Sequence, residues 1–442
     1  MGLSILEKTK EESGFSMLIT VFFLLGIMSV IIISLGALAL SDMKQLRDMV
    51  ASTKAYYMAE GALEDAIFRL KSTSYDDPSG DYILNFQEGS VSMSITTPPL
   101  DDDRRDIVAT ADSKGRVRKE EVTLSIQSTE KSFFYAIQAG NGHFYIDNNA
   151  LVNGNIYSNG DIIGVNKNNS IVYGNAIAVG TIDTVTISDC TDPPDCLETT
   201  DDREAKADIL DNCVIEGDAY YTDSISDCDV SGSTYHEDSP PESVPFPDID
   251  IGFWKTEAAD GGLLPTGGGD YTPSDGEKIG PNKIDGNLTI EGGNTVYIEG
   301  PIWVTGGIII ENNATLRLTS GYEDRSGIII ADGKVELRNG GKVQGSGDDD
   351  SYLLVVSTDF SLDDAAPAID IRNNSESGIF YAPNGMVVVG NSASIREITG
   401  LGIHLNENCE ITYETGLESV EFTTGPGGSW QVTKWHEVKP GD

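Results

Sequence analysis

Three consecutive aspartates, Asp348, Asp349 and Asp350, are the best candidates in the chain for carboxylates that could do chemistry. Enzymes that cleave polysaccharides use carboxylates about 5–9 Å apart, or acids that bind Ca²⁺ beside a basic residue. The flanking sequence GSGDDDS is typical of a polar loop, so these aspartates are weak catalytic candidates. Other residues that could take part lie in neighbouring repeats: Arg317, Arg325, Arg338, Asp363 and Asp364.

No established catalytic motif accompanies these acids. The chain has four histidines but no H-E-x-x-H, no G-x-S-x-G and no Walker loop. Since nothing marks a nucleophile or a general base, we predict that the protein is not an enzyme. The alternative is a surface-anchored enzyme that acts on polysaccharide. The histidines are His143, His236, His404 and His436.

Four of the five cysteines fall between residues 189 and 228. In an oxidising exterior, Cys190, Cys196, Cys213 and Cys228 are disulfide candidates, and pairing within each neighbouring couple is the simplest of three connectivities. Cys409 remains, and we expect a buried thiol. The spacings match no standard zinc site, so we predict no metal ligation by cysteine.

The acidic composition limits the partners of the chain. The formal net charge is −42, from 71 acidic and 29 basic residues among 442, which argues against nucleic acid or anionic lipid as a partner of the soluble part. Asp101–Asp103 with Asp106 could hold Ca²⁺, but Arg104 and Arg105 adjoin them and a solvated loop is favoured. We predict no cofactor.

Residues 15–40 form an uncharged apolar run without proline. As a helix it is roughly 39 Å long, enough to cross a bilayer core of about 30 Å. Small residues within the sequence GALA at 36–39 leave a cleaved secretory signal as an alternative, but the run is about twice the usual length for one. We therefore predict a retained anchor in contact with membrane lipid.

The junction Gly14–Phe15 resembles the processing site of type IV prepilins, in which a short polar leader ends in glycine. The resemblance implies a leader of residues 1–14, cleavage by a prepilin peptidase and contact with other pilin subunits. It also implies a single pass through the inner (cytoplasmic) membrane with the C-terminal region outside. Most pilins have glutamate at the fifth mature position, where this chain has Ile19. That departure favours a minor subunit, or one that never enters a filament.

The stretch from Ser41 to Lys71 continues as an amphipathic helix, with apolar residues at three- and four-residue steps. Its sequence AYYMAEGALE, residues 55–64, is similar to the segment that follows the membrane span in minor pilins of the PilX type. The resemblance implies one stem helix over residues 15–71, roughly 85 Å long, with Tyr57, Glu60 and Leu63 as stem contacts.

Residues 72–131 predict a small pilin-like antiparallel sheet that packs on the stem. Four strand-like runs, 82–86, 91–95, 107–111 and 117–126, alternate with turn-rich loops. Burial of one face of each run against the apolar side of the helix would stabilise both elements.

Residues 132–442 predict a parallel β-helix. A motif of a β-branched residue, any residue, glycine and a small polar residue recurs, and VNGNIYSNG aligns with VYGNAIAVG 20 residues later. Asparagines recur 17 or 18 residues apart, and Gly and Asn tolerate the left-handed backbone that coil corners need. An antiparallel β-sandwich is the competing architecture.

Two segments interrupt or end this pattern. Residues 189–262 are rich in cysteine and proline and predict an insertion, within which residues 248–259 form a helix that covers the side or an open end of the solenoid. The run from Gly425 to Trp435 is expected to close the last coil. The fold class is thus mainly β, with an N-terminal pilin-like region. The predicted function is a minor pilin that displays a solenoid for pilus assembly or for adhesion to surface glycans or proteins.

Overall fold

The computed structural model describes residues 8–71, 80–96, 104–125, 128–131, 133–188, 203–376, 378–423 and 431–438. The chain is mainly β with one long N-terminal apolar helix. It divides into two compact units, the first made of residues 1–125 with 432–442 and the second of residues 126–431. The C-terminal segment therefore belongs with the N-terminal unit.

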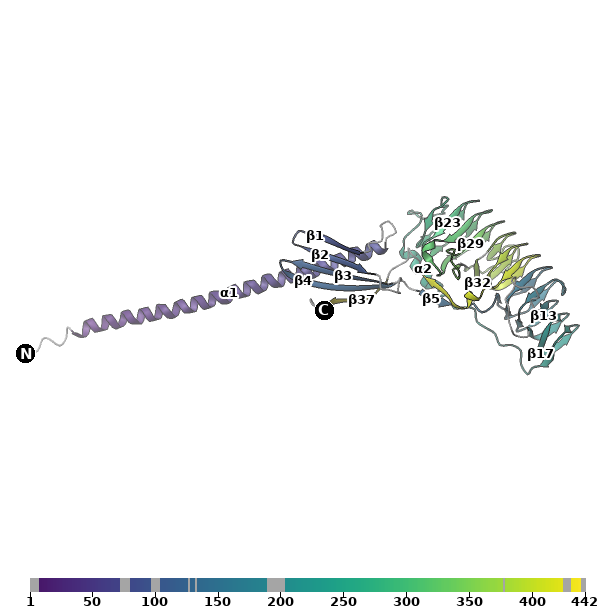
Figure 1. Ribbon diagram of the computed structural model, residues 1–442, viewed down its shortest axis with the longest axis horizontal. Helices are drawn as coiled ribbons and strands as arrows, with labels where there is room; N and C mark the ends of the chain where they lie inside the picture. The colour runs from purple at the N-terminus through teal and green to yellow at the C-terminus, as the bar shows by residue number, and fades with distance from the viewer. Residues whose placement is uncertain are drawn as a thin grey trace, which may run out of the picture. The chain divides into compact units, whose positions relative to one another are not determined.

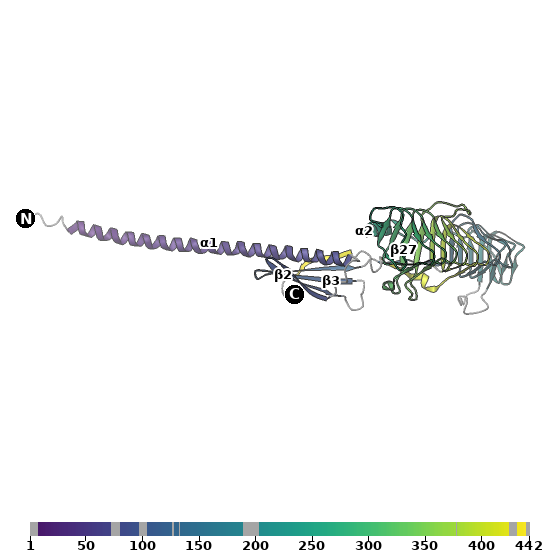
Figure 2. The same cartoon turned by 90° about the horizontal axis from the view of Figure 1, so that it is seen from above.

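The first unit consists of helix α1 and an antiparallel sheet. Helix α1 is unbroken from Lys8 to Lys71 and packs along one face of the sheet (Figure 2). The four predicted strands are present; the first three are slightly longer than expected, and the fourth has the expected length but starts one residue earlier. The sheet order is β1-β2-β3-β4-β37, with β1 Gly80–Phe86, β2 Gly89–Thr96, β3 Arg104–Ser113, β4 Arg116–Ser125 and β37 Gln431–Val438.

Strand β37 corrects the expectation for the C-terminal end. Trp435 does not close a coil, because its indole Nε1 donates to Glu120 in β4 at 3.0 Å. Thr433 donates to the carbonyl of Thr123 at 3.1 Å. The second unit is thus an insertion, in chain order, between two adjacent strands of the first unit's sheet.

The second unit is a stack of coils in which each strand pairs in parallel with the matching strand of the next coil (Figure 1). This parallel pairing does not fit the antiparallel sandwich alternative. The first half of the stack contains β6 Ile137–Ala139, β7 Phe144–Ile146, β8 Leu151–Asn153, β9 Ile156–Ser158, β10 Ile162–Gly164, β11 Ile171–Tyr173, β12 Ala176–Ala178, β13 Thr181–Asp183, β14 Thr186–Ser188, β15 Arg203–Asp211, β16 Val214–Ile215, β17 Gly217–Ser226, β18 Asp229–Val230 and β19 Thr234–His236.

The second half begins after helix α2, Ile251–Asp260. It contains β20 Lys278–Ile279, β21 Asn282–Ile284, β22 Leu288–Ile290, β23 Thr295–Ile298, β24 Ile302–Val304, β25 Ile308–Ile310, β26 Thr315–Leu318, η1 Ser320–Tyr322, β27 Gly327–Ala331, β28 Val335–Leu337, β29 Lys342–Gln344, β30 Leu353–Ser357, β31 Ile369–Ile371, β32 Ile379–Val389, β33 Ser394–Ile395, β34 Glu397–Leu405, β35 Glu410–Thr412 and η2 Thr415–Ser419. Strands β5 Ser128–Lys131 and β36 Val420–Thr423 pair antiparallel where the chain enters and leaves the unit.

A ladder of fully buried side chains runs through both halves of the stack. Most coils contribute three-residue strands with two inward residues and one outward residue, so identical positions stack upon one another. One such ladder, followed by register from coil to coil, is Leu288, Ile308, Val335, Ile369, Val387, Ile403, Phe144, Ile162, Ile182 and Leu210.

The repeats predicted from glycine and asparagine fall where the coils turn. Val152 pairs with Val172, so the two sequences aligned at an offset of 20 residues occupy equivalent places. Asn149 and Asn408 both have positive φ, 59° and 61°, and the Asn149 amide donates to the Asn408 side chain at 3.3 Å. Asparagine tolerates this left-handed conformation, which explains its recurrence at the corner.

The order of coils in space differs from their order in the chain. Strands β34 and β35 pair with β6, β7 and β8, so a C-terminal coil stacks directly on the first N-terminal coil. We call this contact the seam. From the seam, residues 137–236 build the stack in one direction, and residues 263–412 occupy the other. The coil that begins the unit in sequence therefore lies inside the stack.

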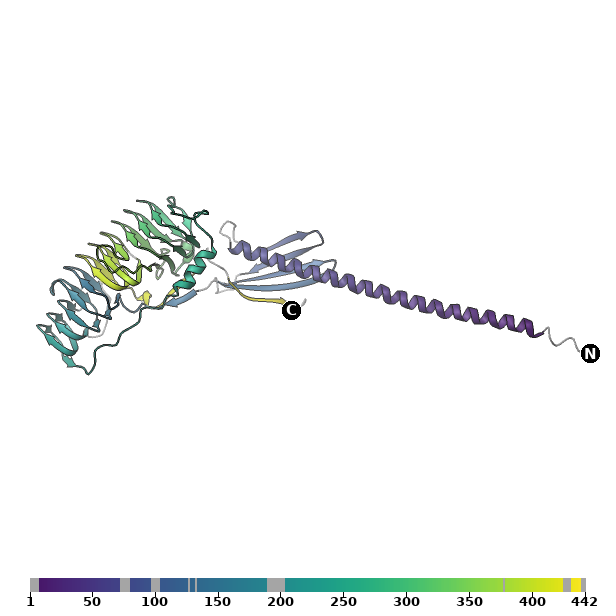
Figure 3. The ribbon, with the colours of Figure 1, turned by 180° about the vertical axis from the view of Figure 1, so that it is seen from behind.

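The segment expected as an insertion at residues 189–262 has three described parts. Residues 203–236 are coils of the stack rather than an insertion. Residues 237–250, here called the strap, run back along the coils to α2 (Figure 3). Helix α2 begins at the predicted cap, where Asp250 accepts from the Phe253 amide at 2.9 Å, and ends at Gly261. It covers the side of the stack over β21, β24 and β27, with Trp254 buried.

Hydrogen bonds to the main chain hold the strap on the coils. Asn159 donates to the Val244 carbonyl at 2.8 Å and accepts from the Val244 amide at 2.9 Å. Three further side chains donate to strap carbonyls: Gln138 to Pro245 at 2.9 Å, Tyr381 to Pro247 at 2.9 Å, and Tyr157 to Glu242. Because these side chains come from coils on both sides of the seam, the strap spans the seam.

Candidate functional site

The apolar part of α1 is the most exposed hydrophobic surface in the described chain. Every side chain from Phe15 to Arg47 is exposed, and Ile19 is 51% exposed. The helix is long and apolar enough to cross a membrane, with a mean hydropathy of 2.8 in its most apolar window. Gly14 lies within α1, whereas residues 1–7 of the expected leader lie outside the described residues.

The stem half of α1 contacts the sheet through small residues rather than through the expected apolar stripe. Leu63 is fully buried, but Tyr57 is 64% exposed and Glu60 is only partly buried. Alanine side chains let the helix axis approach the sheet closely, which the sequence stripe of larger residues did not predict. The buried alanines are Ala51, Ala55, Ala59, Ala62 and Ala66.

The three aspartates proposed as catalytic acids, Asp348, Asp349 and Asp350, all lie exposed on one loop before β30. Two of the arginines expected to face them have other partners. Arg317 donates to the Ser346 carbonyl at 2.8 Å. The Arg338 guanidinium pairs with the carboxylates of Glu311, which follows β25, and of Glu336 in β28. Arg317 thus contacts the backbone of the loop that carries the aspartates, whereas Arg338 is engaged with the carboxylates of Glu311 and Glu336.

The other predicted acidic site is only partly described. Asp101–Asp103, the expected calcium loop, lie outside the described residues. The fourth residue of that group, Asp106, accepts from Arg104 at 3.0 Å and from Thr123 at 2.8 Å. Its oxygen is thus engaged within the sheet of the first unit.

A different cluster forms around His404, next to the seam. Its Nδ1 lies 2.8 Å from an oxygen of Asp364, and its Nε2 lies 3.3 Å from an oxygen of Asp147. Tyr145 meets the imidazole edge-on, with ring centroids 5.7 Å apart, and His143 stacks on Tyr145. Both ring nitrogens face carboxylates rather than a serine or cysteine, so the arrangement lacks the nucleophile of a hydrolytic triad.

Sequence reasoning named His404 and Asp364 separately but did not bring them together. Coil stacking places His404 beside Tyr145, a pairing across the seam that no local sequence pattern reveals. Within the described residues, no cluster of three or more His, Cys, Asp or Glu side chains has the arrangement of a metal site.

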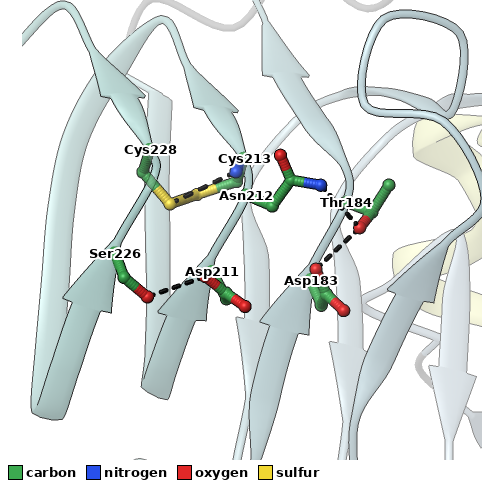
Figure 4. The surroundings of a disulfide bond; sticks show 7 residues. All are labelled: Asp183, Thr184, Asp211, Asn212, Cys213, Ser226 and Cys228. Carbon is green, nitrogen blue, oxygen red and sulfur yellow. Dashed lines mark hydrogen bonds between the residues drawn. A yellow bond between two sulfur atoms is a disulfide. The ribbon is translucent and has the colours of Figure 1, made fainter.

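The disulfide candidates have different outcomes. Cys213 is joined to Cys228, 15 residues later, across the last two coils of the first half (Figure 4). Cys190 and Cys196 lie outside the described residues. Cys409 is a buried free thiol, and burial raises its pKa to about 12.

Glu397 is a buried carboxylate that the sequence did not single out. One of its oxygens accepts from Thr399 at 2.7 Å, and the other has no hydrogen-bond partner among the described residues. Burial raises the pKa of Glu397 well above its ordinary value. The residue begins β34 and therefore belongs to the coil that forms the seam.

Comparisons with known proteins give little to transfer. The chain matches no protein-family model and no curated protein sequence. Among solved structures it is similar to the competence-associated pilin ComZ from Thermus thermophilus, with 13% identity over 88% of this chain and 98% of that chain. The TM-score is 0.30, which is too low to assign a fold or a function.

Proposed function

We propose that the chain is a membrane-anchored, pilin-like minor subunit that holds a rigid coil stack outside the cytoplasm. The apolar half of α1 anchors the protein in the inner membrane and packs with other pilin subunits during assembly. The stack is displayed for contact with surface glycans or proteins. Gly14 and Phe15 are the proposed processing site, and Ile19 marks a subunit outside the main repeating filament.

The observation that carries this proposal is that the two halves of α1 have different surroundings. One unbroken helix leaves its first half wholly exposed and packs its second half on an antiparallel sheet. The exposed apolar surface from Phe15 to Leu40 is costly in water, so it needs lipid or other subunits around it. The prepilin-like junction at Gly14–Phe15 favours the pilus machinery as the route to that environment.

We also propose that the coil stack is a parallel β-helix. Parallel pairing from coil to coil, the continuous buried ladders and the left-handed asparagine corners support this class. A stack of this kind is stiff because each coil is hydrogen-bonded to the next along its strands. Stiffness suits a surface that must present residues at a fixed distance from the membrane.

Mass spectrometry of the mature N-terminus tests the processing step. On co-expression with a prepilin peptidase, we expect Met1–Gly14 to be lost and Phe15 to become the first residue. The variant Gly14→Leu should stay uncleaved. Gly26→Leu is the matched control, since a side chain at Gly26 meets no atom within 4 Å, and it should be cleaved normally. If the native chain retains residues 1–14, the pilin proposal fails.

The rival proposal is a surface-anchored enzyme acting on polysaccharide, with Asp348, Asp349 and Asp350 as its acids. The exposure of all three and the other partner of Arg317 favour a polar loop instead. We propose that replacement of all three by alanine leaves any activity on glycans unchanged. Loss of a measured glycan-cleaving activity in this variant would favour the enzyme.

A further inference from the structure

Among the residues that the structure describes, no strand or helix covers the coil that ends the first half of the stack. This open end consists of β18, β19 and the second part of β17. Within the described residues, β19 pairs only with β17, and β18 pairs only with β16. Helix α2 covers the side of the stack near the opposite end, whereas no described helix lies over the open end. Figure 1 shows the strap leaving from this coil.

The backbone of β19 directs unpaired groups to the open side. The Ala219 amide donates to the Ser233 carbonyl at 2.9 Å, and the Glu237 amide donates to the Tyr221 carbonyl at 2.8 Å. Alternate residues of a strand point their N–H and C=O groups to opposite edges. Thr234 and His236 therefore present theirs to the outside, and both residues are exposed.

The interior of the last coil is also only partly covered. The side chains of Tyr221, Ile225 and Val230 pack against the core but remain partly exposed, whereas Leu210, one coil further in, is fully buried. The Cys213–Cys228 disulfide ties this coil to its neighbour (Figure 4). An edge that is stapled covalently stays ordered enough to act as a template for another strand.

The seam shows that coils of this protein accept strands that do not follow them in the chain. Strand β34 adds in parallel to β6 and β7, although about 259 residues separate the paired segments. The open end offers the same kind of strand edge, because β19 continues the register of β17. The two edges differ in the charge of the residues around them.

Residues 217–238 carry six acidic side chains and no lysine or arginine. Lys206, from the preceding coil, is engaged with Glu237 at 2.6 Å. Two copies of this surface would repel each other, so a second copy of the chain is disfavoured as the occupant. The remaining acids favour a positively charged partner, and they are Asp218, Asp223, Asp227, Asp229 and Asp238.

We infer that the open end binds an extended, basic segment of another polypeptide by addition of a parallel strand to β19. The strand's main chain pairs with Thr234 and His236, and its inward side chains stack on these two residues as they stack on Ala219 and Tyr221. Its lysines or arginines face the carboxylates. The inference rests on the display role proposed above and names the class of partner. Its test uses purified protein and is independent of cleavage at Gly14.

Binding of three blocked octapeptides to the full-length protein in detergent, at low ionic strength, tests this inference. An alternating Lys-Val peptide should bind. A Lys-Pro peptide of the same charge, which lacks half of the strand's amide donors, should bind at least about tenfold more weakly. A Glu-Val peptide should not bind. Hydrogen exchange with the Lys-Val peptide should slow at the amides of Thr234 and His236.

Matched variants separate strand addition from general attraction to an acidic protein. Replacement of Asp223, Asp227 and Asp229 by asparagine should weaken Lys-Val binding about tenfold. Replacement of the three aspartates at 348–350 by asparagine removes the same charge from a distant loop and should change it less than about twofold. Equal binding of the Lys-Val and Lys-Pro peptides, equal effects of the two triple variants, or protection elsewhere in the stack would overturn the inference. So would dimerisation through this edge in the absence of peptide.

Discussion

Asn159 makes two of the hydrogen bonds that hold the strap on the coils, and replacing Asn159 is the sharpest test of this part of the fold. Replacement of Asn159 by alanine deletes two reciprocal hydrogen bonds to Val244, of 2.8 and 2.9 Å. Each such bond contributes about 0.5–1.5 kcal/mol net. The variant should therefore lower the free energy of strap opening by about 1–3 kcal/mol, a factor of roughly 5–150 in the open population.

Limited proteolysis by a glutamyl endopeptidase measures this opening. Glu242 lies near the middle of the strap and is exposed, as is Ser243, but cleavage requires several neighbouring residues to leave the coils. When reclosing is fast, the cleavage rate follows the open population, so Asn159→Ala should be cut after Glu242 roughly 5–150 times faster than the wild type.

Asn148→Ala is the control for this measurement. Asn148 also makes two side-chain hydrogen bonds, to Asn166 at 3.1 Å and to Asn169 at 3.0 Å, and both partners lie in the coils rather than in the strap. Its replacement should leave cleavage after Glu242 unchanged. If both variants are cut at the wild-type rate, the strap is not held by these bonds and the reasoning is wrong.

Three further predictions concern stability. Because burial raises the pKa of Glu397, its contribution is present below the unfolded carboxyl pKa of about 4.3 and is lost as the pH rises through the folded value; Glu397→Gln should raise Tm at pH 8, with the gain shrinking toward pH 4. Replacing Cys213 and Cys228 by serine should destabilise the open end by about 3 kcal/mol, seen as faster hydrogen exchange in β17–β19 with no change in β21–β25. Ala59→Leu should cost about 1–3 kcal/mol by overpacking the stem, seen as faster exchange in β3 and β4, whereas Gly61→Leu, which faces open space, should not.

The local features of the fold could be predicted from the sequence because they depend on neighbouring residues. The cap at Asp250, the four strands of the N-terminal sheet and the 20-residue offset between Val152 and Val172 all lie within one turn, hairpin or coil. Periodicity and turn chemistry report such features directly. The mainly β class with one long apolar helix followed from the same signals.

The stem contact shows where hydrophobic periodicity misleads. Large residues such as Leu46 and Met49 are exposed, whereas Ala55 and Ala59 are fully buried. An apolar stripe predicts the face that leaves water, but in this helix large apolar residues lie outside the contact with the sheet. Small residues then mark the face where the helix approaches its own sheet.

The His404 cluster and the place of Trp435 could not be predicted, because both depend on pairings between distant segments. Asp147 and His404 meet only because β34 stacks on β7, and Trp435 reaches Glu120 only because β37 joins β4. Any coil edge of the stack would offer the same backbone groups to β34. The sequence therefore allows the individual coils to be predicted, but not the order in which they stack in space.

The long chain segment that the seam closes predicts that this order is a late feature of folding. Successive coils such as those joined at Asn155 and Asn175 are 20 residues apart, whereas Asn153 and Glu410 in the seam are 257 residues apart. Loop-closure entropy grows as (3/2)RT ln n, so the seam costs about 2 kcal/mol more to close than a contact between successive coils. Burial of Phe144 against Ile403, together with the strap that spans the same place, offsets this cost only once both halves are formed. Each half can thus grow coil by coil from local contacts, and the seam joins them when matched edges already exist.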